Sequence, residues 1–131
     1  MKLNNFKKQA GLTLIEVTLV IAVLLGLISV LFIGVGAYKE GSDRAKCILN
    51  ITNAQKAVRS YQNMYEIAEG ASITQGTIFG AGKMVETLPS CPSSGTYTFS
   101  STVPAVGTAY LTCDFGSGDT AHAPTGGTAG W

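Results

Sequence analysis

Residues 11–38 read GLTLIEVTLVIAVLLGLISVLFIGVGAY and hold the most informative pattern in this chain of 131 residues. From Val17 to Tyr38 there are 22 consecutive residues with neither a charge nor a proline. At about 1.5 Å per residue, a helix of that length spans roughly 33 Å, close to the thickness of a bilayer's hydrocarbon core. A chain this small could not cover such a helix on every face, so the pattern favours a membrane-spanning helix over a buried core helix.

The flanks of this apolar run predict its orientation. The amino terminus and three lysines precede the run, whereas the basic residues that follow it are offset by Glu40 and Asp43. The positive-inside rule therefore favours a cytoplasmic N-terminus. A secretory signal peptide would have a shorter apolar stretch and a cleavage site of the Ala-x-Ala kind, and this sequence has neither feature. The basic residues concerned are Lys2, Lys7 and Lys8 before the run, and Lys39, Arg44 and Lys46 after it.

A specific motif stands where the basic leader meets the apolar helix. Gly11 occupies the boundary, Thr-Leu-Ile-Glu follows at residues 13–16, and Glu16 lies five residues beyond the glycine. A carboxylate in an apolar helix is costly unless it is paired or lies near the interface, so Glu16 is a functional candidate. The simpler alternative is that Glu16 reaches back to the cytoplasmic headgroups from the first turn of the helix.

This combination resembles the type IV prepilin and type II secretion pseudopilin superfamily. The family pattern is a short basic leader, a glycine, an apolar residue that is usually Phe, Thr-Leu-Ile-Glu, and a long apolar helix. Here Leu12 stands at the usual Phe position. The resemblance implies that a prepilin peptidase cuts between Gly11 and Leu12 on the cytoplasmic side and that the new amino terminus of Leu12 is N-methylated. It also implies that Glu16 pairs with that amine on a neighbouring subunit, which sets the register of a filament because a misplaced subunit would bury an unpaired charge.

The exported half begins with a second helical pattern. Apolar residues recur at three- and four-residue steps from Cys47 to Ala68, and this predicts an amphipathic helix that starts with Ser42 or Asp43 as N-cap and ends near Gly70. Glycine lowers helix propensity by about 1 kcal/mol per residue, so we expect the upstream helix to bend or locally melt around three glycines during assembly. These are Gly34, Gly36 and Gly41.

The remaining sequence predicts a small sheet. Residues 70–83 form a connecting loop, with one short helix around residues 78–86. Residues 96–100 and 109–113 are predicted as antiparallel strands, with Tyr97 and Phe99 on one face of the first. We therefore expect an α+β, pilin-like fold in which a small antiparallel sheet packs on the outer half of a long N-terminal helix. The predicted parts are a cleaved leader (residues 1–11), a transmembrane helix (12–38), an exported domain (39–115) and a flexible tail (116–131).

Three cysteines leave one unpaired if a disulfide forms. The exported side of a bacterial inner membrane is oxidising, and Cys91 and Cys113 bracket the predicted hairpin. A bridge that closes about 22 residues would stabilise the fold by roughly 3 kcal/mol on the entropic model. The sequence leaves this pairing open because it does not give the Cα separation. We expect Cys47 to be a small buried hydrophobic residue and His122 to be a solvated residue of the tail.

Nothing in the sequence predicts catalysis, a cofactor or a metal site. No phosphate-binding loop, zinc-ligand pattern or carboxylate pair is present. Asp114 and Asp119 could line a calcium loop, but their glycine-rich setting is also plain turn chemistry. Without the three leader lysines, six basic residues stand against eight acidic ones. Such a balance gives no support for nucleic-acid binding.

The functional expectation is a structural subunit of a filament in the bacterial inner membrane, later periplasmic or extracellular, and most similar to a type II secretion pseudopilin. The implied partners are other pilins or pseudopilins, the prepilin peptidase, the inner-membrane assembly platform with its ATPase, and the bilayer. One alternative is a minor type IV pilin with a role at the tip, in adhesion or in DNA uptake. A second is a membrane-tethered periplasmic domain of another activity.

Overall fold

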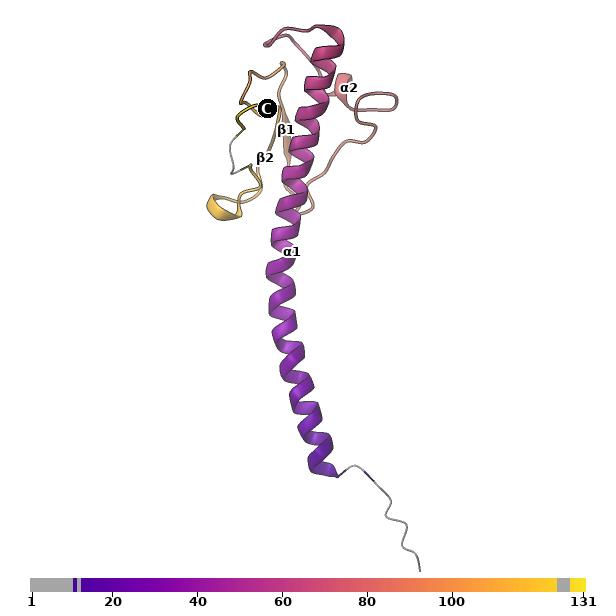
Figure 1. Ribbon diagram of the computed structural model, residues 1–131, viewed down its shortest axis with the longest axis vertical. Helices are drawn as coiled ribbons and strands as arrows, with labels where there is room; N and C mark the ends of the chain where they lie inside the picture. Colours follow the sequence, from indigo (N-terminus) through magenta and orange to yellow (C-terminus); the bar gives the residue numbers. More distant parts are fainter. Residues whose placement is uncertain (1–10, 12, 125–127) are drawn as a thin grey trace, which may run out of the picture. The chain divides into compact units, whose positions relative to one another are not determined.

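The computed structural model describes Gly11, residues 13–124 and residues 128–131. Its elements follow the order α1, α2, β1, β2 and the short 3-10 helix η1 (Figure 1). The chain divides into two compact units, which meet in sequence between Tyr38 and Lys39. Helix α1 contributes residues to both units. The element bounds are Leu14–Tyr65 for α1, Gln75–Ile78 for α2, Tyr97–Phe99 for β1, Leu111–Cys113 for β2 and Gly118–Thr120 for η1.

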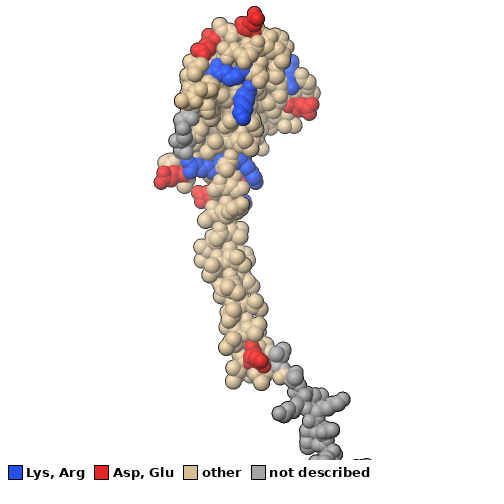
Figure 2. Space-filling model, viewed as in Figure 1, with Lys and Arg blue, Asp and Glu red and all other residues tan. Residues whose placement is uncertain are grey.

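The first unit contains the apolar half of α1. The large apolar side chains from Leu14 to Val35 are exposed, and this stretch is long and apolar enough to cross a membrane. The sequence has no Asp, Glu, Lys or Arg between Glu16 and Lys39, and Figure 2 shows a long stretch of the helix without a red or blue side chain. The chain therefore has one apolar helix near its N-terminus that could span a bilayer, as the sequence predicts.

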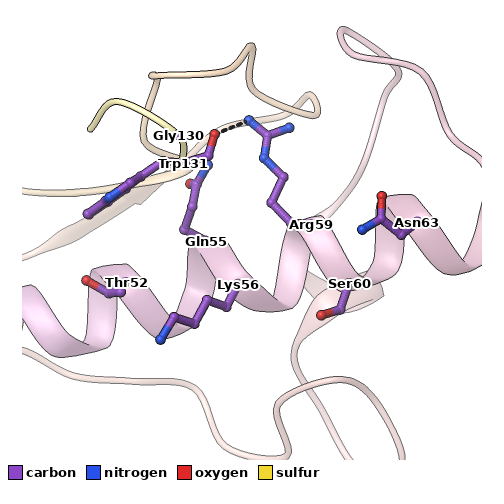
Figure 3. A pocket seen from close by; sticks show the side chains of 8 residues that line it. All are labelled: Thr52, Gln55, Lys56, Arg59, Ser60, Asn63, Gly130 and Trp131. Atoms are coloured by element: carbon purple, nitrogen blue, oxygen red, sulfur yellow. Dashed lines mark hydrogen bonds between the residues drawn. The ribbon is translucent and has the colours of Figure 1, made fainter. Parts of the chain in front are cut away.

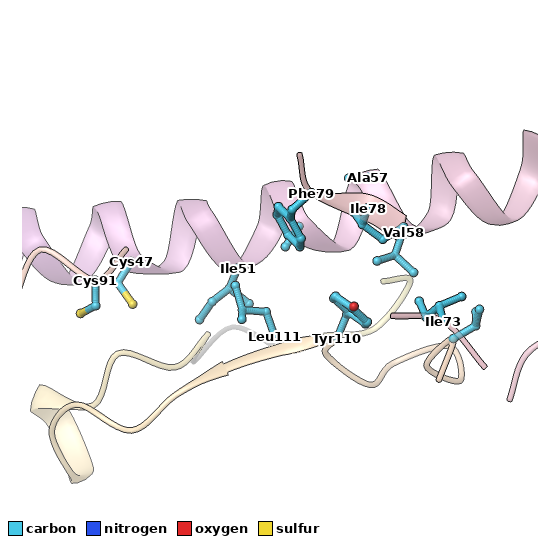
Figure 4. Close-up of a cluster of buried hydrophobic side chains, with 12 residues drawn as sticks. Cys47, Ile51, Ala57, Val58, Ile73, Ile78, Phe79, Cys91, Tyr110 and Leu111 are labelled. Carbon is cyan, nitrogen blue, oxygen red and sulfur yellow. The ribbon is translucent and has the colours of Figure 1, made fainter. Parts of the chain in front are cut away.

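The second unit is built on the other half of α1, whose buried residues recur at helical spacing. Figure 4 shows the buried side chain of Leu111, from β2, directed toward this face of the helix beside Ile51. The hydrophobic core consists of Cys47, Ile51, Ala54, Ala57, Val58, Ile73, Ile78, Phe79, Cys91, Val103, Tyr110 and Leu111.

Strands β1 and β2 pair antiparallel, with Tyr97 opposite Cys113 and Phe99 opposite Leu111. The predicted hairpin and its direction are confirmed. Each strand has three residues, so the sheet depends on the helix beneath it for stability. A buried side chain of α1 holds the segment that leads into β2: Gln55 donates to the carbonyl of Thr108 at 3.1 Å and accepts from the amide of Tyr110 at 2.7 Å.

Three local predictions are wrong. Helix α1 continues through Gly41, so neither Ser42 nor Asp43 is an N-cap. It ends at Tyr65, and not near Gly70, because Glu66 adopts a left-handed φ of 52° and the amide of Ile67 closes the last turn on the carbonyl of Gln62 at 3.0 Å. The short helix α2 lies at Gln75–Ile78, so it shares only its last residue with the predicted range 78–86. The α+β layout itself is confirmed.

Candidate functional site

The N-terminal motif forms the start of α1. The amide of Thr13 donates to the Glu16 carboxylate at 3.3 Å, and the amide of Glu16 donates to the Thr13 hydroxyl at 3.3 Å. This reciprocal pair is a capping box, which satisfies two of the unpaired amides at the helix start. Gly11 is exposed, whereas Leu12 and the predicted leader before Gly11 lie outside the described residues. The capping role of Thr13 and Glu16 is readable from the Thr-x-x-Glu spacing, and our sequence reasoning missed it.

A second constellation lies wholly in the second unit. It combines the three cysteines of the chain with its single histidine. Cys47 comes from α1, Cys91 from the loop before β1, Cys113 from the end of β2, and His122 from the segment after η1. One sulfur or nitrogen atom from each residue lies within 4.8 Å of the others. Figure 4 shows two of the sulfurs, those of Cys47 and Cys91, close together at one end of the core.

His122 is fixed in this cluster by its backbone and its ring. Its amide donates to the carbonyl of Phe115 at 3.0 Å, and its ring packs on the Phe115 ring with a centroid separation of 4.5 Å. The Nδ1 atom lies 3.3 Å from the sulfur of Cys91. His122 is 1% exposed, so the prediction that it is a solvated residue is wrong.

The surroundings of the thiols act on their protonation in opposite directions. Burial raises the pKa of Cys47 to about 12, although a hydrogen bond from the Tyr97 hydroxyl at 3.3 Å opposes that rise. For Cys91 burial also acts to raise the pKa, but hydrogen bonds with the backbone at Ser93 and Gly95 and with the thiols of Cys113 and Cys47 together lower the pKa. Burial raises the pKa of Cys113. The protein therefore stabilises a thiolate most strongly at Cys91.

The cluster brings together residues that the sequence had treated separately. Cys47 is fully buried, as predicted. Cys91 and Cys113 do lie together, and both are free thiols in this structure, so their disulfide stays a prediction. The sequence predicts no metal site because it does not show that these four donor residues lie together. A signal in the sequence was that all three thiols and the single imidazole of the chain lie after the apolar run that ends at Tyr38.

The described parts of the tail also have specific partners. The backbone carbonyl of Trp131 accepts a hydrogen bond from Arg59 at 2.8 Å (Figure 3). The half-buried Trp131 lines a groove of about 470 Å³ beside polar residues of α1. The groove is lined by Thr52, Gln55, Lys56, Arg59, Ser60, Asn63, Gly130 and Trp131. The sequence predicts a flexible tail and gives no sign of these contacts beyond the terminal tryptophan itself.

No family model matches the chain, and comparisons with curated proteins and with solved structures find no similar protein.

Proposed function

We propose that this protein is a structural subunit of a pilus or pseudopilus filament, most similar to a type II secretion pseudopilin and without enzymatic activity. The observation that carries the proposal is the apolar half of α1. Its large apolar side chains are exposed from Leu14 to Val35, and Glu16 is the one acidic or basic residue of this stretch. Such a surface needs either lipid or other apolar helices around it.

A filament subunit meets both environments, lipid before assembly and apolar helices of other subunits after it. Before assembly, the bilayer covers the apolar surface of α1 and Glu16 reaches the cytoplasmic interface. After assembly, the same surfaces of neighbouring subunits cover one another. Glu16 then faces the amine of Leu12 on another subunit, and this pairing selects one axial register because any other would leave a buried charge without a partner.

The proposal places the protein in the bacterial inner membrane with its N-terminus in the cytoplasm. A prepilin peptidase would remove residues 1–11 and N-methylate Leu12. An inner-membrane platform with a cytoplasmic ATPase would then add the subunit to a periplasmic or extracellular filament. The second unit, beginning at Lys39, would form the filament's outer surface.

The test is the intact mass and N-terminal sequence of the protein from cells with and without prepilin peptidase. We expect a mature chain that begins at methylated Leu12 only when the peptidase is present. A Gly11→Ala variant tests the boundary residue, since a glycine at the cleavage position is part of the motif; it should keep its leader even with the peptidase. A wild-type chain that still carries residues 2–11 in peptidase-positive cells would overturn the proposal and leave a membrane-tethered domain.

A further inference from the structure

We propose that Cys47, Cys91, Cys113 and His122 bind one Zn²⁺ ion in a four-coordinate Cys₃His site. The site would join the hairpin and the segment after η1 to helix α1. It does not depend on the proposed function, because a filament subunit and a membrane-tethered domain could both use it.

The positions of the donor atoms suit a single ion. The four ligand atoms lie within 4.8 Å of one another. In a tetrahedral site with Zn–S bonds of about 2.3 Å, neighbouring sulfurs are roughly 3.8 Å apart. Small side-chain rotations would bring the separations of the four ligand atoms to those of a tetrahedral zinc site. His122 presents Nδ1 to the sulfurs, at 3.3 Å from Cys91, so Nδ1 is the nitrogen that would bind the metal.

The chemistry of the donor set selects zinc over calcium or magnesium. Soft thiolates bind zinc well, whereas the two alkaline-earth ions require oxygen ligands. A Cys₃His set fills all four coordination positions with protein ligands, which is typical of structural zinc sites and leaves no position for a catalytic water or a substrate. Cys47, Cys91 and His122 are buried and Cys113 is partly buried, so the ion would be shielded from water and from competing ligands.

The residues around the sulfurs are arranged to receive negative charge. Gly95 packs against the sulfurs, since a Cβ there would lie 2.8 Å from Cys113 Sγ and 3.2 Å from Cys91 Sγ. The Tyr97 hydroxyl donates to the sulfur of Cys47 at 3.3 Å. Hydrogen bonds of this kind orient metal ligands and stabilise their deprotonated state.

A metal ion also gives every member of the cluster a role. A disulfide between Cys91 and Cys113 would use two of the sulfurs and leave the thiol of Cys47 and the ring of His122 beside it. One zinc ion would use all four donors. It would also add a second tie between α1 and the segment from η1 to His122, beside the hydrogen bond from Arg44 to the carbonyl of Asp119 at 2.7 Å.

The experiment uses the full chain in detergent, purified without chelators. Elemental analysis should find about one zinc per chain, and after denaturation with a chelator a thiol reagent should count three free thiols. Replacement by Co²⁺ should give the visible absorption of tetrahedral cobalt bound to thiolates. Removal of the zinc should lower the thermal midpoint of the second unit, and added Zn²⁺ should restore it.

Variants test which residues hold the ion. His122→Ala and Cys47→Ser should each weaken zinc binding by at least about tenfold, measured by competition with a chromophoric chelator. Asp119→Asn removes an exposed carboxylate close in sequence to His122 and should bind zinc like the wild type. A wild-type chain that contains a Cys91–Cys113 disulfide, or that neither retains zinc nor produces the cobalt spectrum, would overturn the proposal even if the variants failed to fold.

Discussion

At the scale of single residues, Glu16 has a local role that can be separated from its proposed role in assembly. In the isolated chain its carboxylate accepts from the amide of Thr13, and the hydroxyl of Thr13 accepts from the amide of Glu16. The capping box needs a side-chain oxygen, which glutamine also supplies. Pairing with an amine on another subunit needs the negative charge. Glu16→Gln therefore removes the charge that pairing needs and keeps the oxygen that the capping box needs.

We predict that Glu16→Gln leaves membrane insertion and leader cleavage intact but lowers the yield of sheared filaments by at least about tenfold. An unpaired buried amine costs about 3–5 kcal/mol, and each 1.4 kcal/mol is a factor of ten. Thr13→Ala is the matched control, since it loses a cap worth about 1 kcal/mol and keeps the charge. Wild-type filament yield from Glu16→Gln, together with none from Thr13→Ala, would show that the carboxylate serves only as a cap.

Tyr110 and Tyr97 give a second comparison between single residues. The hydroxyl of Tyr110 is buried without a hydrogen-bond partner among the described residues, whereas that of Tyr97 contacts Cys47 and Asn50. We predict that Tyr110→Phe leaves the thermal midpoint unchanged or raises it, and that Tyr97→Phe lowers stability by about 1 kcal/mol. Thermal unfolding followed by circular dichroism measures both. Equal losses in the two variants would indicate that the Tyr110 hydroxyl has a partner such as bound water.

The Tyr110 variant should also change the response to alkali. Burial raises the pKa of Tyr110 in the folded state, so the unfolded chain loses this proton first, near pH 10. The corresponding stability is present below about pH 10 and is lost as the pH rises from there toward the folded-state pKa. We predict a smaller loss of stability above pH 10 in Tyr110→Phe than in the wild type. An identical pH dependence of the thermal midpoint in both proteins would contradict this.

At the scale of elements, α1 carries two surfaces with different partners. Its first half is apolar and exposed, and its second half buries residues at helical spacing against the hairpin. The two strands have only three residues each. Gln55 ties the segment that leads into β2 to the helix, since its side chain donates to the carbonyl of Thr108 and accepts from the amide of Tyr110.

We predict that Gln55→Ala destabilises the second unit by about 1–3 kcal/mol. The substitution removes two hydrogen bonds and leaves the buried amide of Tyr110 without an acceptor. Lys56→Ala is the control, because Lys56 is the exposed neighbour on the same helix and surface changes usually stay within about 0.5 kcal/mol. Denaturant unfolding of both variants gives the comparison. Equal midpoints would show that another group replaces Gln55 as the partner of Thr108 and Tyr110.

At the scale of the whole molecule, the chain separates into a part that needs an apolar environment and a part that has its own core. The core residues all belong to the unit that begins at Lys39. No residue of the apolar half of α1 up to Tyr38 is buried. The two units should therefore differ in what they need from their surroundings, and they can be tested apart.

We predict that a fragment of residues 39–131 is soluble and folded, with cooperative thermal unfolding. The full chain should instead sediment with membranes and resist an alkaline carbonate wash, because residues 14–38 hold it in the bilayer. A chain of residues 1–38 joined to an unrelated soluble protein is the control for anchoring. Extraction of the full chain by carbonate would contradict the membrane assignment, and an unfolded fragment would show that the second unit needs the first.

The sequence by itself determined the apolar helix, the amphipathic continuation and the antiparallel hairpin, because these patterns depend on periodicity over neighbouring residues. It did not determine that α1 passes Ser42 and Asp43 without an N-cap there or that Glu66 ends it, since those outcomes depend on small differences in local backbone preference. Only the tertiary structure decided that Cys47 meets His122, 75 residues away in sequence. Packing of the tail on the core fixes that contact, and such packing is a property of the folded chain rather than of any short segment.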